Sequence, residues 1–531
     1  MRLGIDFGTT RTVVAACDRG NYPLISFNAR SGDSQEFFPS VVAEKAGQLC
    51  FGFEALSRRG EPGWTLCFSF KRWLSAPDAT PGRRVQVGSL EIDLVSLVSR
   101  YLDALRSALL TDSNLPRKSS RETLEATIAV PANSFSTQRL VTLEAFRNAG
   151  FRVLSMLNEP SAAGVEYAHR YRNTLNSRRE KVLVYDLGGG TFDVSLVDMQ
   201  GQAHDVVASR GLGRLGGDDF DDVLLDLALK QAGVRRSALS ANTLVELGQH
   251  CRELKEAINP NTRKIHVELE RYASPAERKQ LKLPEGKGVI VTMDAYDSAC
   301  TPLLDRTLEL VRQTLAVSPG AAVAQASNDD GEESSVQGIA GVYVVGGASA
   351  LPAVARGLRT AYGRRVKRSP YPSGAIAIGL AIAADEAAAF ELTQRYQHNL
   401  GVFREVQGGM EIGFDRIIGP ETLVPVPGGE PVRLSRRYRA THNVGHFRFI
   451  ECGWLDDTGG PSGDIKPFAD VRFPFDPTLR TESDLSLVPV ARTPVEGPEI
   501  EERYSISEYG TVELTILDRE SGFERHYKIA G

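Results

Sequence analysis

The chain has 531 residues, of which 42% are hydrophobic and 24% charged, and its formal net charge is -5. This length exceeds that of a typical single domain, and the composition is ordinary for a globular protein. The slightly acidic balance gives no general attraction to nucleic acid or to anionic membranes, so neither is expected as a partner. The first apolar run is short and contains Asp6, and no run is long enough to span a bilayer. We therefore expect a cytoplasmic protein without a secretory signal.

Two glycine-rich strings stand out, GIDFGTT at residues 4–10 and DLGGGTFD at residues 186–193. Each follows or ends an apolar run typical of a strand, and each precedes a second apolar run that closes with Asp and a turn Gly. The chain therefore contains the same predicted hairpin twice. Glycine lets the backbone approach a ligand closely, and consecutive N–H groups in such a bend form a concavity for anions. Two such bends facing each other predict a polyphosphate site between two lobes.

Strands and helices alternate up to about residue 386, which predicts an α/β architecture. Residues 135–148 have the pattern of a helix, with Ser134 as its N-cap and Gly150 as its stop. A long alanine-rich helix is predicted from 374 to 397. Other predicted elements are strands at 124–130, 181–187, 192–197 and 341–345, and helices at 221–232, 241–258 and 294–316.

The stretch 324–337 is polar, acidic and aperiodic, and is interpreted as a mobile surface insertion. From residue 400 the pattern changes to short alternating runs separated by Gly, Pro and Asp, such as FRFI at 447–450 and VELTI at 512–516. Regular short strands with frequent turns predict a β-sandwich. No helical pattern follows the last predicted strand, at 526–529.

Polar residues beside the two bends have the chemistry of a phosphate and metal site. Asp6 and Asp186 lie at predicted strand ends, and Mg²⁺ prefers carboxylates, retained waters and phosphate oxygens. A single such Asp would be interpreted as a turn former, but the duplication favours the metal role. Thr9, Thr10 and Thr191 adjoin the glycines, which favours hydroxyl contacts to phosphate oxygens.

A third cluster, GLGRLG at residues 211–216, matches the dinucleotide fingerprint G-x-G-x-x-G. The helix predicted after it opens with four carboxylates, at Asp218, Asp219, Asp221 and Asp222. These would repel a pyrophosphate, although they suit the helix dipole. We therefore do not expect a dinucleotide site at this cluster.

Together with VPA at 130–132, NEPSAA at 158–163, GGDDFD at 216–221 and VGG at 345–347, the two bends resemble the actin-like ATPase superfamily. The fuller strings resemble one branch of it, the heat shock protein 70 (DnaK-type) chaperones. The resemblance is specific over 1–386 and weaker over 400–531. It implies a two-lobed actin-like (ribonuclease H-like) nucleotide-binding domain at 1–386, an interdomain linker at 387–399 and a substrate-binding-like β-sandwich at 400–531. We expect no C-terminal helical lid.

The resemblance also implies roles for individual residues. Lys71, Glu159 and Thr191 would be catalytic, with Lys71 and Glu159 positioning the attacking water and stabilising the γ-phosphate. Pro131 and Arg139 match the proline and arginine that link nucleotide state to the second domain. Three carboxylates would surround Mg²⁺ and its waters: Asp6, Asp186 and Asp193. Contacts to ATP or ADP are expected from Gly8, Thr9, Thr10, Gly188, Gly189, Gly190, Gly216, Gly217, Lys255, Gly346 and Gly347.

The chain departs from the family pattern where the nucleotide base would lie. Arg252 stands in place of a Glu, Glu256 in place of an Arg, and Asn259 in place of a Ser. The string GGASALP at 346–352 lacks the arginine that stacks on adenine, and losing that contact removes roughly 1–2 kcal/mol of base binding. YPSG at 371–374 also replaces Asn-Pro-Asp-Glu. We therefore predict intact phosphate machinery, altered adenine recognition, and weak nucleotide affinity and turnover.

The predicted function is an ATP-hydrolysing chaperone of protein folding and the stress response, in which nucleotide state controls the binding of unfolded or extended polypeptide. A J-domain co-chaperone and a nucleotide exchange factor are its implied partners. The main alternative is a nucleotide-sensing assembly or adaptor factor that holds one fixed protein partner with little turnover. It is motivated by the altered base pocket and by the linker, ELTQRYQHN at 391–399, which lacks the family's leucine-rich segment. A sugar kinase on the same fold would leave the sandwich unexplained.

Overall fold

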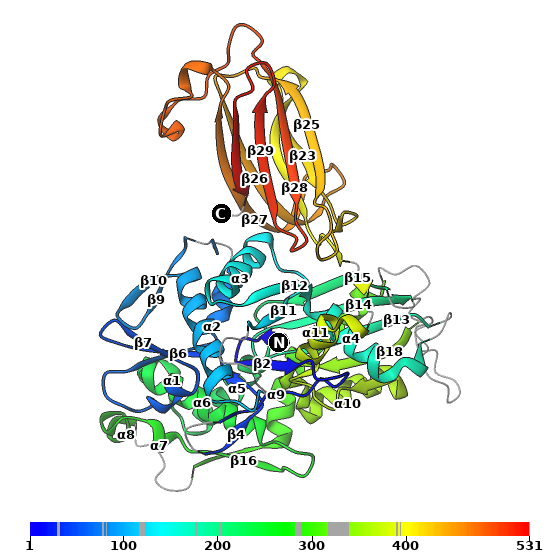
Figure 1. Cartoon of the computed structure of the whole chain (residues 1–531). Helices are drawn as coiled ribbons and strands as arrows, with labels where there is room; N and C mark the ends of the chain where they lie inside the picture. Colours follow the sequence, from blue (N-terminus) through cyan, green and yellow to red (C-terminus); the bar gives the residue numbers. More distant parts are fainter. Residues whose placement is uncertain are drawn as a thin grey trace.

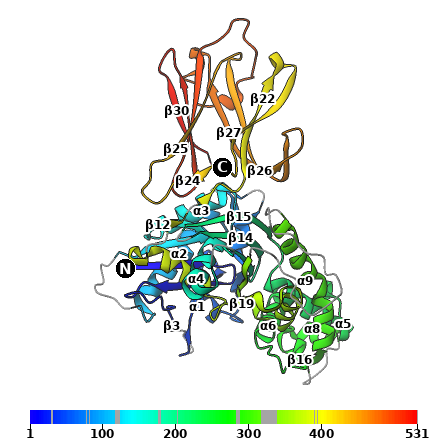
Figure 2. The same cartoon turned by 90° about the vertical axis from the view of Figure 1, so that its right-hand side faces the viewer.

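The computed structural model describes residues 1–28, 32–76, 79–80, 82–115, 123–175, 179–200, 203–281, 288–316, 339–388, 391–392 and 394–529. Two lobes with mixed sheets form the broad lower part of the molecule, called the base below. A pair of long sheets, called the sandwich, rises from it (Figures 1 and 2). This arrangement fits a two-lobed α/β domain followed by a β-sandwich. The predicted insertion at 324–337 lies outside the described residues.

The first lobe is built on a five-stranded sheet in the order β12-β11-β1-β2-β5. β1 and β2 form the predicted hairpin, and β11 and β12 extend it in parallel. The strands are β1 (Arg2–Phe7), β2 (Arg11–Ala16), β5 (Phe38–Pro39), β11 (Glu125–Val130) and β12 (Arg152–Asn158). The helices α2 (Leu94–Thr111) and α3 (Ser136–Asn148) pack on it, and smaller elements lie outside: β3 (Phe27–Asn28), β4 (Ser34–Gln35), β6 (Val41–Lys45), β7 (Gln48–Phe51), α1 (Gly52–Ser57), β8 (Thr65–Phe68), η1 (Phe70–Ser75), β9 (Arg84–Val87) and β10 (Leu90–Asp93).

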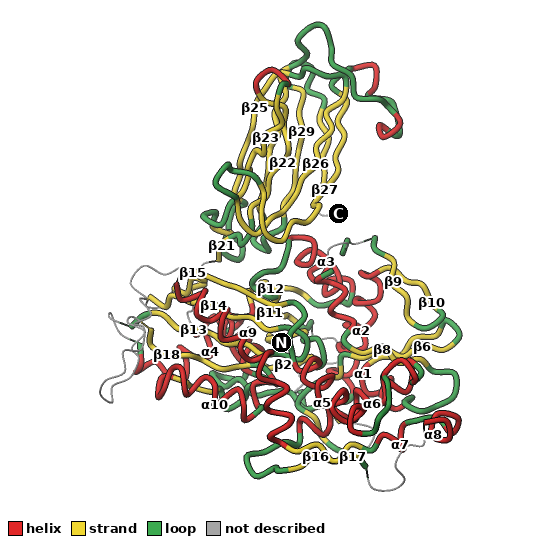
Figure 3. Tube along the Cα trace, turned by 180° about the vertical axis from the view of Figure 1, so that it is seen from behind, coloured by secondary structure: helices red, strands yellow, loops and turns green. Residues whose placement is uncertain are grey.

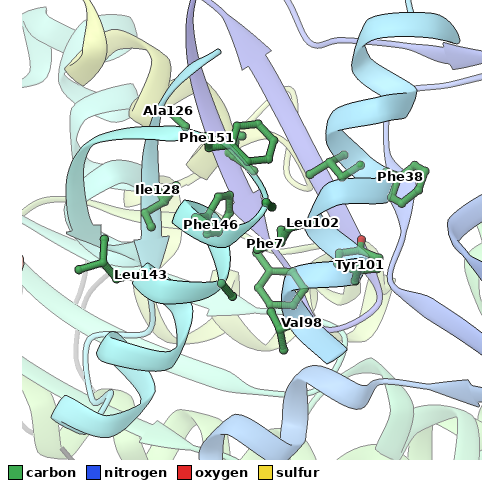
Figure 4. Close-up of a cluster of buried hydrophobic side chains, with 14 of the residues drawn as sticks. Phe7, Phe38, Val98, Tyr101, Leu102, Ala126, Ile128, Leu143, Phe146 and Phe151 are labelled. Carbon is green, nitrogen blue, oxygen red and sulfur yellow. The ribbon is translucent and has the colours of Figure 1, made fainter. Parts of the chain in front are cut away.

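Aromatic packing in this lobe fixes the first glycine bend (Figure 4). The ring of Tyr101 on α2 lies 5.4 Å from Phe7, at the end of β1, and 5.1 Å from Phe70. Its hydroxyl also hydrogen-bonds to the Thr12 hydroxyl at 2.7 Å, at the start of β2. Because Lys71 follows the buried Phe70, the same core holds the predicted catalytic lysine in place.

The second lobe repeats this plan in a six-stranded sheet of order β19-β18-β13-β14-β15-β20. Its hairpin pairs Asp186 of β13 with Asp193 of β14, and β18 runs parallel to β13. The strands are β13 (Lys181–Leu187), β14 (Phe192–Gln200), β15 (Ala203–Leu212), β18 (Ile339–Val345), β19 (Val366–Arg368) and β20 (Glu391–Leu392). Its other elements are α5 (Gly217–Gln231), α6 (Ala241–Glu256), β16 (Lys264–Val267), α7 (Leu269–Tyr272), α8 (Pro275–Leu281), β17 (Val289–Thr292), α9 (Met293–Ala316) and α10 (Pro352–Tyr362).

Two buried helices join the lobes. α4 (Glu159–Tyr171) packs on β13, β14 and β15, α11 (Ala375–Ala384) packs on β1, β2 and β11, and the two helices pack on each other. The contact requires glycine, because a Cβ on Gly379 would lie 1.8 Å from the carbonyl oxygen of Ala162. The prediction of one helix from 374 to 397 was wrong: α11 ends at Ala384, because the backbone of 391–392 and of 394–395 pairs with strands of two sheets instead.

The last part of the chain forms two antiparallel four-stranded sheets, β23-β22-β26-β27 and β25-β28-β29-β30 (Figure 3). Their inner faces enclose Phe449, Phe473 and Tyr504. The strands are β22 (Asn399–Val406), β23 (Glu411–Ile418), β25 (Val432–Arg439), β26 (Val444–Leu455), β27 (Pro461–Pro474), β28 (Glu499–Ile506), β29 (Val512–Asp518) and β30 (Glu524–Ile529). Short strands lead into it, β21 (Gln394–Arg395) and β24 (Leu423–Val424). Among the described helices, none has the length and apolarity needed to cross a membrane.

Replacing Gly379 by Val should destabilise the base by about 3 kcal/mol, since the added carbons have no space between α11 and α4. Urea unfolding monitored by circular dichroism measures the effect. The matched control is Gly248→Val on α6, where an added Cβ meets nothing within 4 Å, and its effect should stay within about 1 kcal/mol. Equal midpoints for the two variants would contradict the packing described here.

Candidate functional site

The two glycine bends face each other across a cleft between the lobes. A Cβ on Gly189 would lie 2.6 Å from the side chain of Thr10, and one on Gly190 would lie 2.7 Å from that of Thr9. The β1–β2 and β13–β14 bends therefore approach so closely that positions 189 and 190 have no room for a Cβ. The space left between them is lined by main-chain groups and hydroxyls from both lobes.

Most of the predicted site residues line this cleft. They are Asp6, Gly8, Thr9, Thr10, Lys71, Glu159, Asp186, Gly188, Gly189, Thr191, Gly217, Lys255, Gly346 and Gly347. Five others do not line it. Gly190 belongs to the second bend and faces Thr9, and Gly216 packs against it, since a Cβ on Gly216 would meet the Gly190 backbone at 2.6 Å. Asp193 is buried on β14, Pro131 directly follows β11, and Arg139 on α3 contacts the Tyr509 carbonyl of the sandwich.

The second bend is held rigid by the start of α5. The N–H groups of Gly217 and Asp218 donate to the carbonyl oxygens of Gly188 and Gly189, at 2.9 and 2.8 Å. The Gly188 N–H donates to the Thr191 carbonyl at 3.0 Å and closes the loop. A bend preorganised in this way loses little further entropy when it binds an anion.

The floor of the cleft holds a buried ion pair. Lys71 and Glu159 are 8% and 6% exposed, and the Lys71 Nζ lies 3.2 Å from the Glu159 Oε1. The same ammonium lies 5.4 Å from the centroid of the Phe7 ring. Glu159 is the first residue of α4, so helix and sheet together fix the carboxylate beside the two bends.

Three carboxylates around this pair carry strongly shifted pKa values. Burial, reinforced by the charge of Glu159, raises the pKa of Asp6 to about 7 and that of Asp193 to about 7. Burial raises the pKa of Asp186 well above its usual value, and Glu159, Asp193 and Asp6 add to the shift. Lys71 opposes all three shifts. The cleft thus has an excess of buried negative charge that a cation would neutralise.

This charge excess fits a hydrated divalent cation. Among the described residues, no three His, Cys, Asp or Glu side chains converge closely enough to hold a metal ion directly. Mg²⁺ keeps several of its waters and binds through few carboxylates plus phosphate oxygens, so direct convergence is not needed. Asp6, Asp186 and Asp193 would face such an ion and its waters, which stays a prediction.

The side of the cleft where the adenine ring of a nucleotide is expected is occupied by ion pairs. Arg252 contacts Asp218 at 2.5 Å and Asp221 at 3.4 Å. The Lys255 ammonium contacts the Asp221 carboxylate at 2.7 Å and the Gly217 carbonyl at 2.6 Å. Lys255 is therefore neutralised by a neighbouring carboxylate, although it still lines the cleft.

Three arginines that the sequence reasoning did not select connect the lobes. Arg11 in the first lobe pairs with Glu256, while Arg59 pairs with Glu246 at 2.5 Å and Glu253 at 2.9 Å. Arg72 donates to the Gly190 carbonyl at 2.9 Å and lies 3.5 Å from both Asp218 and Asp219. The proximity of Arg72 to Lys71 in the sequence was the available signal, whereas nothing in the sequence marks the partners of Arg11 and Arg59.

A second cluster of buried polar groups joins the base to the sandwich. Glu451 of β26 is 1% exposed and accepts hydrogen bonds from the Ser136 N–H at 2.9 Å, the Ser136 hydroxyl at 2.8 Å and the Tyr396 hydroxyl at 2.7 Å. Ser136 is the first residue of α3, so the carboxylate also meets the positive end of that helix. The predicted Ser134 cap was wrong: the structure gives α3 no side-chain cap from its own segment, and Glu451 fills that role from the other domain.

Arg139 lies at the same boundary. Its guanidinium donates to the Tyr509 carbonyl in the sandwich at 3.2 Å and to the Asn158 Oδ1 in the base at 2.9 Å. Burial lowers the pKa of Arg139 to about 10. In the linker, the Gln394 side chain accepts from the Asn158 N–H at 3.0 Å and donates to the Met156 carbonyl at 2.9 Å. The sandwich, the linker and the residue before Glu159 therefore share one hydrogen-bond network.

The sandwich has a cavity of its own, of about 610 Å³, lined mainly by residues of β22, β23, β25 and β26. β22 and β26 pair from Asn399–Cys452 to Val402–Phe449 and then separate. Within 394–529, all of which is described, the backbone of 403–406 pairs only with β23 and that of 444–448 only with β27. Two unpaired strand edges thus border the cavity.

Comparisons with known proteins agree with this geometry. A sequence model of the Hsp70 protein family matches residues 112–391, more than half of the chain. The chain is 30% identical to the "Chaperone protein HscA homolog" of Burkholderia ambifaria (strain MC40-6) over 446 residues, and to that of Burkholderia pseudomallei (strain 668) over 447. Each match covers 80% of this chain, which spans 65% of the length of the curated relatives it matches. The chain belongs to the Hsp70 family.

Proposed function

We propose that this chain is an Hsp70-type molecular chaperone that binds and hydrolyses Mg-ATP and uses nucleotide state to control polypeptide binding by its sandwich. The observation that carries the proposal is the pair of facing glycine bends above the buried Lys71–Glu159 pair. Family membership supports the same chemistry. The implied J-domain co-chaperone, exchange factor and cytoplasmic location stay predictions.

Hydrolysis needs positioning and charge stabilisation more than covalent chemistry. The two bends would orient the phosphate chain with their N–H groups and the hydroxyls of Thr9, Thr10 and Thr191. The Lys71 ammonium would stabilise negative charge on the transferred phosphoryl group, and Glu159 would hold the attacking water. Asp6, Asp186 and Asp193 would hold a hydrated Mg²⁺, which would supply positive charge to neutralise the phosphate groups.

Coupling between the domains would run through the shared hydrogen-bond network. Asn158 contacts Arg139, Gln394 and, through the chain, Glu159. Docking of the sandwich therefore fixes the residue that precedes the catalytic carboxylate. A change in that carboxylate's position on nucleotide binding would be transmitted in reverse to Arg139 and the Tyr509 carbonyl.

The split in the sandwich supports an extended polypeptide as the client. Unpaired edges of β22 and β26 offer backbone donors and acceptors on both sides of the cavity. An extended chain satisfies such groups by its own backbone, largely independently of its sequence. Exposed apolar side chains that line the cavity add contact area: Val406 is 40% and Ile412 69% exposed.

Steady-state ATP turnover with and without an unfolded polypeptide tests the proposal, and we expect stimulation. A turnover unaffected by polypeptide, together with a single stoichiometric protein partner in pull-downs, would instead support the adaptor alternative. That outcome would remove the client role while leaving the nucleotide site in place.

Gly189→Val should weaken ATP binding more than about tenfold in calorimetry, because the branched side chain would occupy the phosphate path beside Thr10. Gly213→Val is the matched control, since a Cβ there meets nothing within 4 Å. Because Gly213 lies within the GLGRLG string, the same control tests our expectation that this string binds no nucleotide. Normal affinity in Gly189→Val, or lost affinity in Gly213→Val, would contradict the assignment.

Lys71→Ala and Thr191→Ala should each lower ATP hydrolysis more than about tenfold while ATP still binds, because both groups would act on the reacting phosphate. Single-turnover hydrolysis and calorimetry separate the two effects. Lys45→Ala, at an exposed lysine of β6, should hydrolyse ATP at the parent rate. Unchanged hydrolysis in both site variants would refute the catalytic assignment.

Glu451→Ala should weaken docking of the sandwich by about 2–5 kcal/mol, because three donors lose a buried carboxylate. Cleavage of the linker near residues 391–398 by a protease of broad specificity should become faster. Glu524→Ala, at a partly exposed acid of β30, should leave the cleavage rate unchanged. Equal rates for both variants would remove Glu451 from the interface.

A further inference from the structure

The cavity of the sandwich is unusually rich in arginine. Six arginines line it, against the two carboxylates of Glu405 and Asp415: Arg404, Arg436, Arg437, Arg439, Arg448 and Arg492. Its apolar lining includes Phe403, Phe447 and Phe475. The site therefore combines apolar contact area with an excess of guanidinium groups.

Part of this positive charge is neutralised inside the protein. Arg404 contacts Glu502 at 2.6 Å and Asp415 at 2.7 Å, and Arg436 lies 3.4 Å from the same Asp415 carboxylate. Glu502 is fully buried, so this cluster belongs to the core of the sandwich. Arg437 and Arg439 pair with carboxylates on neighbouring segments, Glu501 and Glu520. Because these four arginines are paired with carboxylates of the protein, they do not decide which charge a ligand should carry.

Arg448 differs from them. It is exposed on β26, within the stretch whose backbone edge is unpaired on the cavity side. Within the described residues, Arg448 makes no ion pair or side-chain hydrogen bond. A guanidinium in this position is available to a carboxylate on a bound chain.

The mouth of the cavity already binds one carboxylate. Glu405 of β22 lies 3.3 Å from the His442 Nε2 and 3.6 Å from the Arg492 guanidinium, and all three residues line the cavity. His442 also pairs with Arg492 through the backbone. The protein's own side chain thus indicates which ligand charge these groups accept. A carboxylate on the incoming chain would compete with Glu405 for the same partners.

We propose that the sandwich selects extended polypeptide segments in which an apolar side chain is flanked by Asp or Glu, with Arg448 and Arg492 contacting the flanking carboxylates. The proposal rests on the proposed client-binding function. Charge complementarity selects the occupant: the apolar lining and the two strand edges accept any extended chain, whereas the guanidinium excess favours an acidic one.

The test measures fluorescence anisotropy of two labelled peptides with the full chain. Both peptides share a core of leucine and valine, and the flanks are aspartate in one and lysine in the other. We expect the acidic peptide to bind about tenfold more tightly at low salt, and this preference to shrink as salt is added. Arg448→Glu and Arg492→Glu should each abolish the preference.

Two controls keep the outcomes separate. Arg433→Glu changes an exposed arginine of β25 that does not line the cavity, and should retain the preference for the acidic peptide. Glu405→Gln removes the internal competitor and should tighten acidic binding. Equal or tighter binding of the lysine peptide would overturn the charge selectivity while client binding stands. Binding of neither peptide would overturn the client function itself.

Discussion

The structure depends on the close approach of two backbone bends that tolerates no side chain. The DLGGGT bend comes so near Thr9 and Thr10 that its second and third glycines have no room for a Cβ. That distance is set by the sheets behind each bend and by α4 and α11, which themselves meet across Gly379. The tight contact between the two bends therefore depends on a second tight contact, the one between α4 and α11 at Gly379. Because both contacts are rigid, the cleft between the lobes has a defined width before any ligand enters.

Whereas packing fixes the cleft between the lobes, the charges inside the same cleft destabilise it. Asp193 is buried and Asp6 and Asp186 are half-buried near Glu159, so that desolvation and the Glu159 charge raise their pKa values while Lys71 opposes the shift. Burying carboxylates in this way destabilises the protein alone and favours any state in which a cation shares the cleft. The arginines that bridge the lobes, Arg11 and Arg72, help to hold the cleft closed around this charge.

Structure that depends on neighbouring residues could be predicted from the sequence. Structure that depends on contacts between distant residues could not. The two hairpins could be predicted because glycine, Asp and Thr stand in order beside apolar runs. The cap of α3 could not, because Glu451 lies 315 residues from Ser136 and reaches it only in the folded protein. The alanine-rich pattern after residue 374 favoured one helix, yet backbone pairing with β15 and β24 ended it at Ala384. For the same reason the cleft-spanning arginines were missed: their partners are set by lobe closure.

The linker strand β20 completes the edge of the second-lobe sheet by pairing in parallel with β15. β20 covers only Ala203 and His204 of β15, so departure of the linker adds these two residues to the backbone edge that β15 leaves unpaired. An open sheet edge can pair with strands from other chains, so release of the linker lengthens the edge that is available for self-association. Variants that release the linker more readily should therefore be less soluble at high protein concentration.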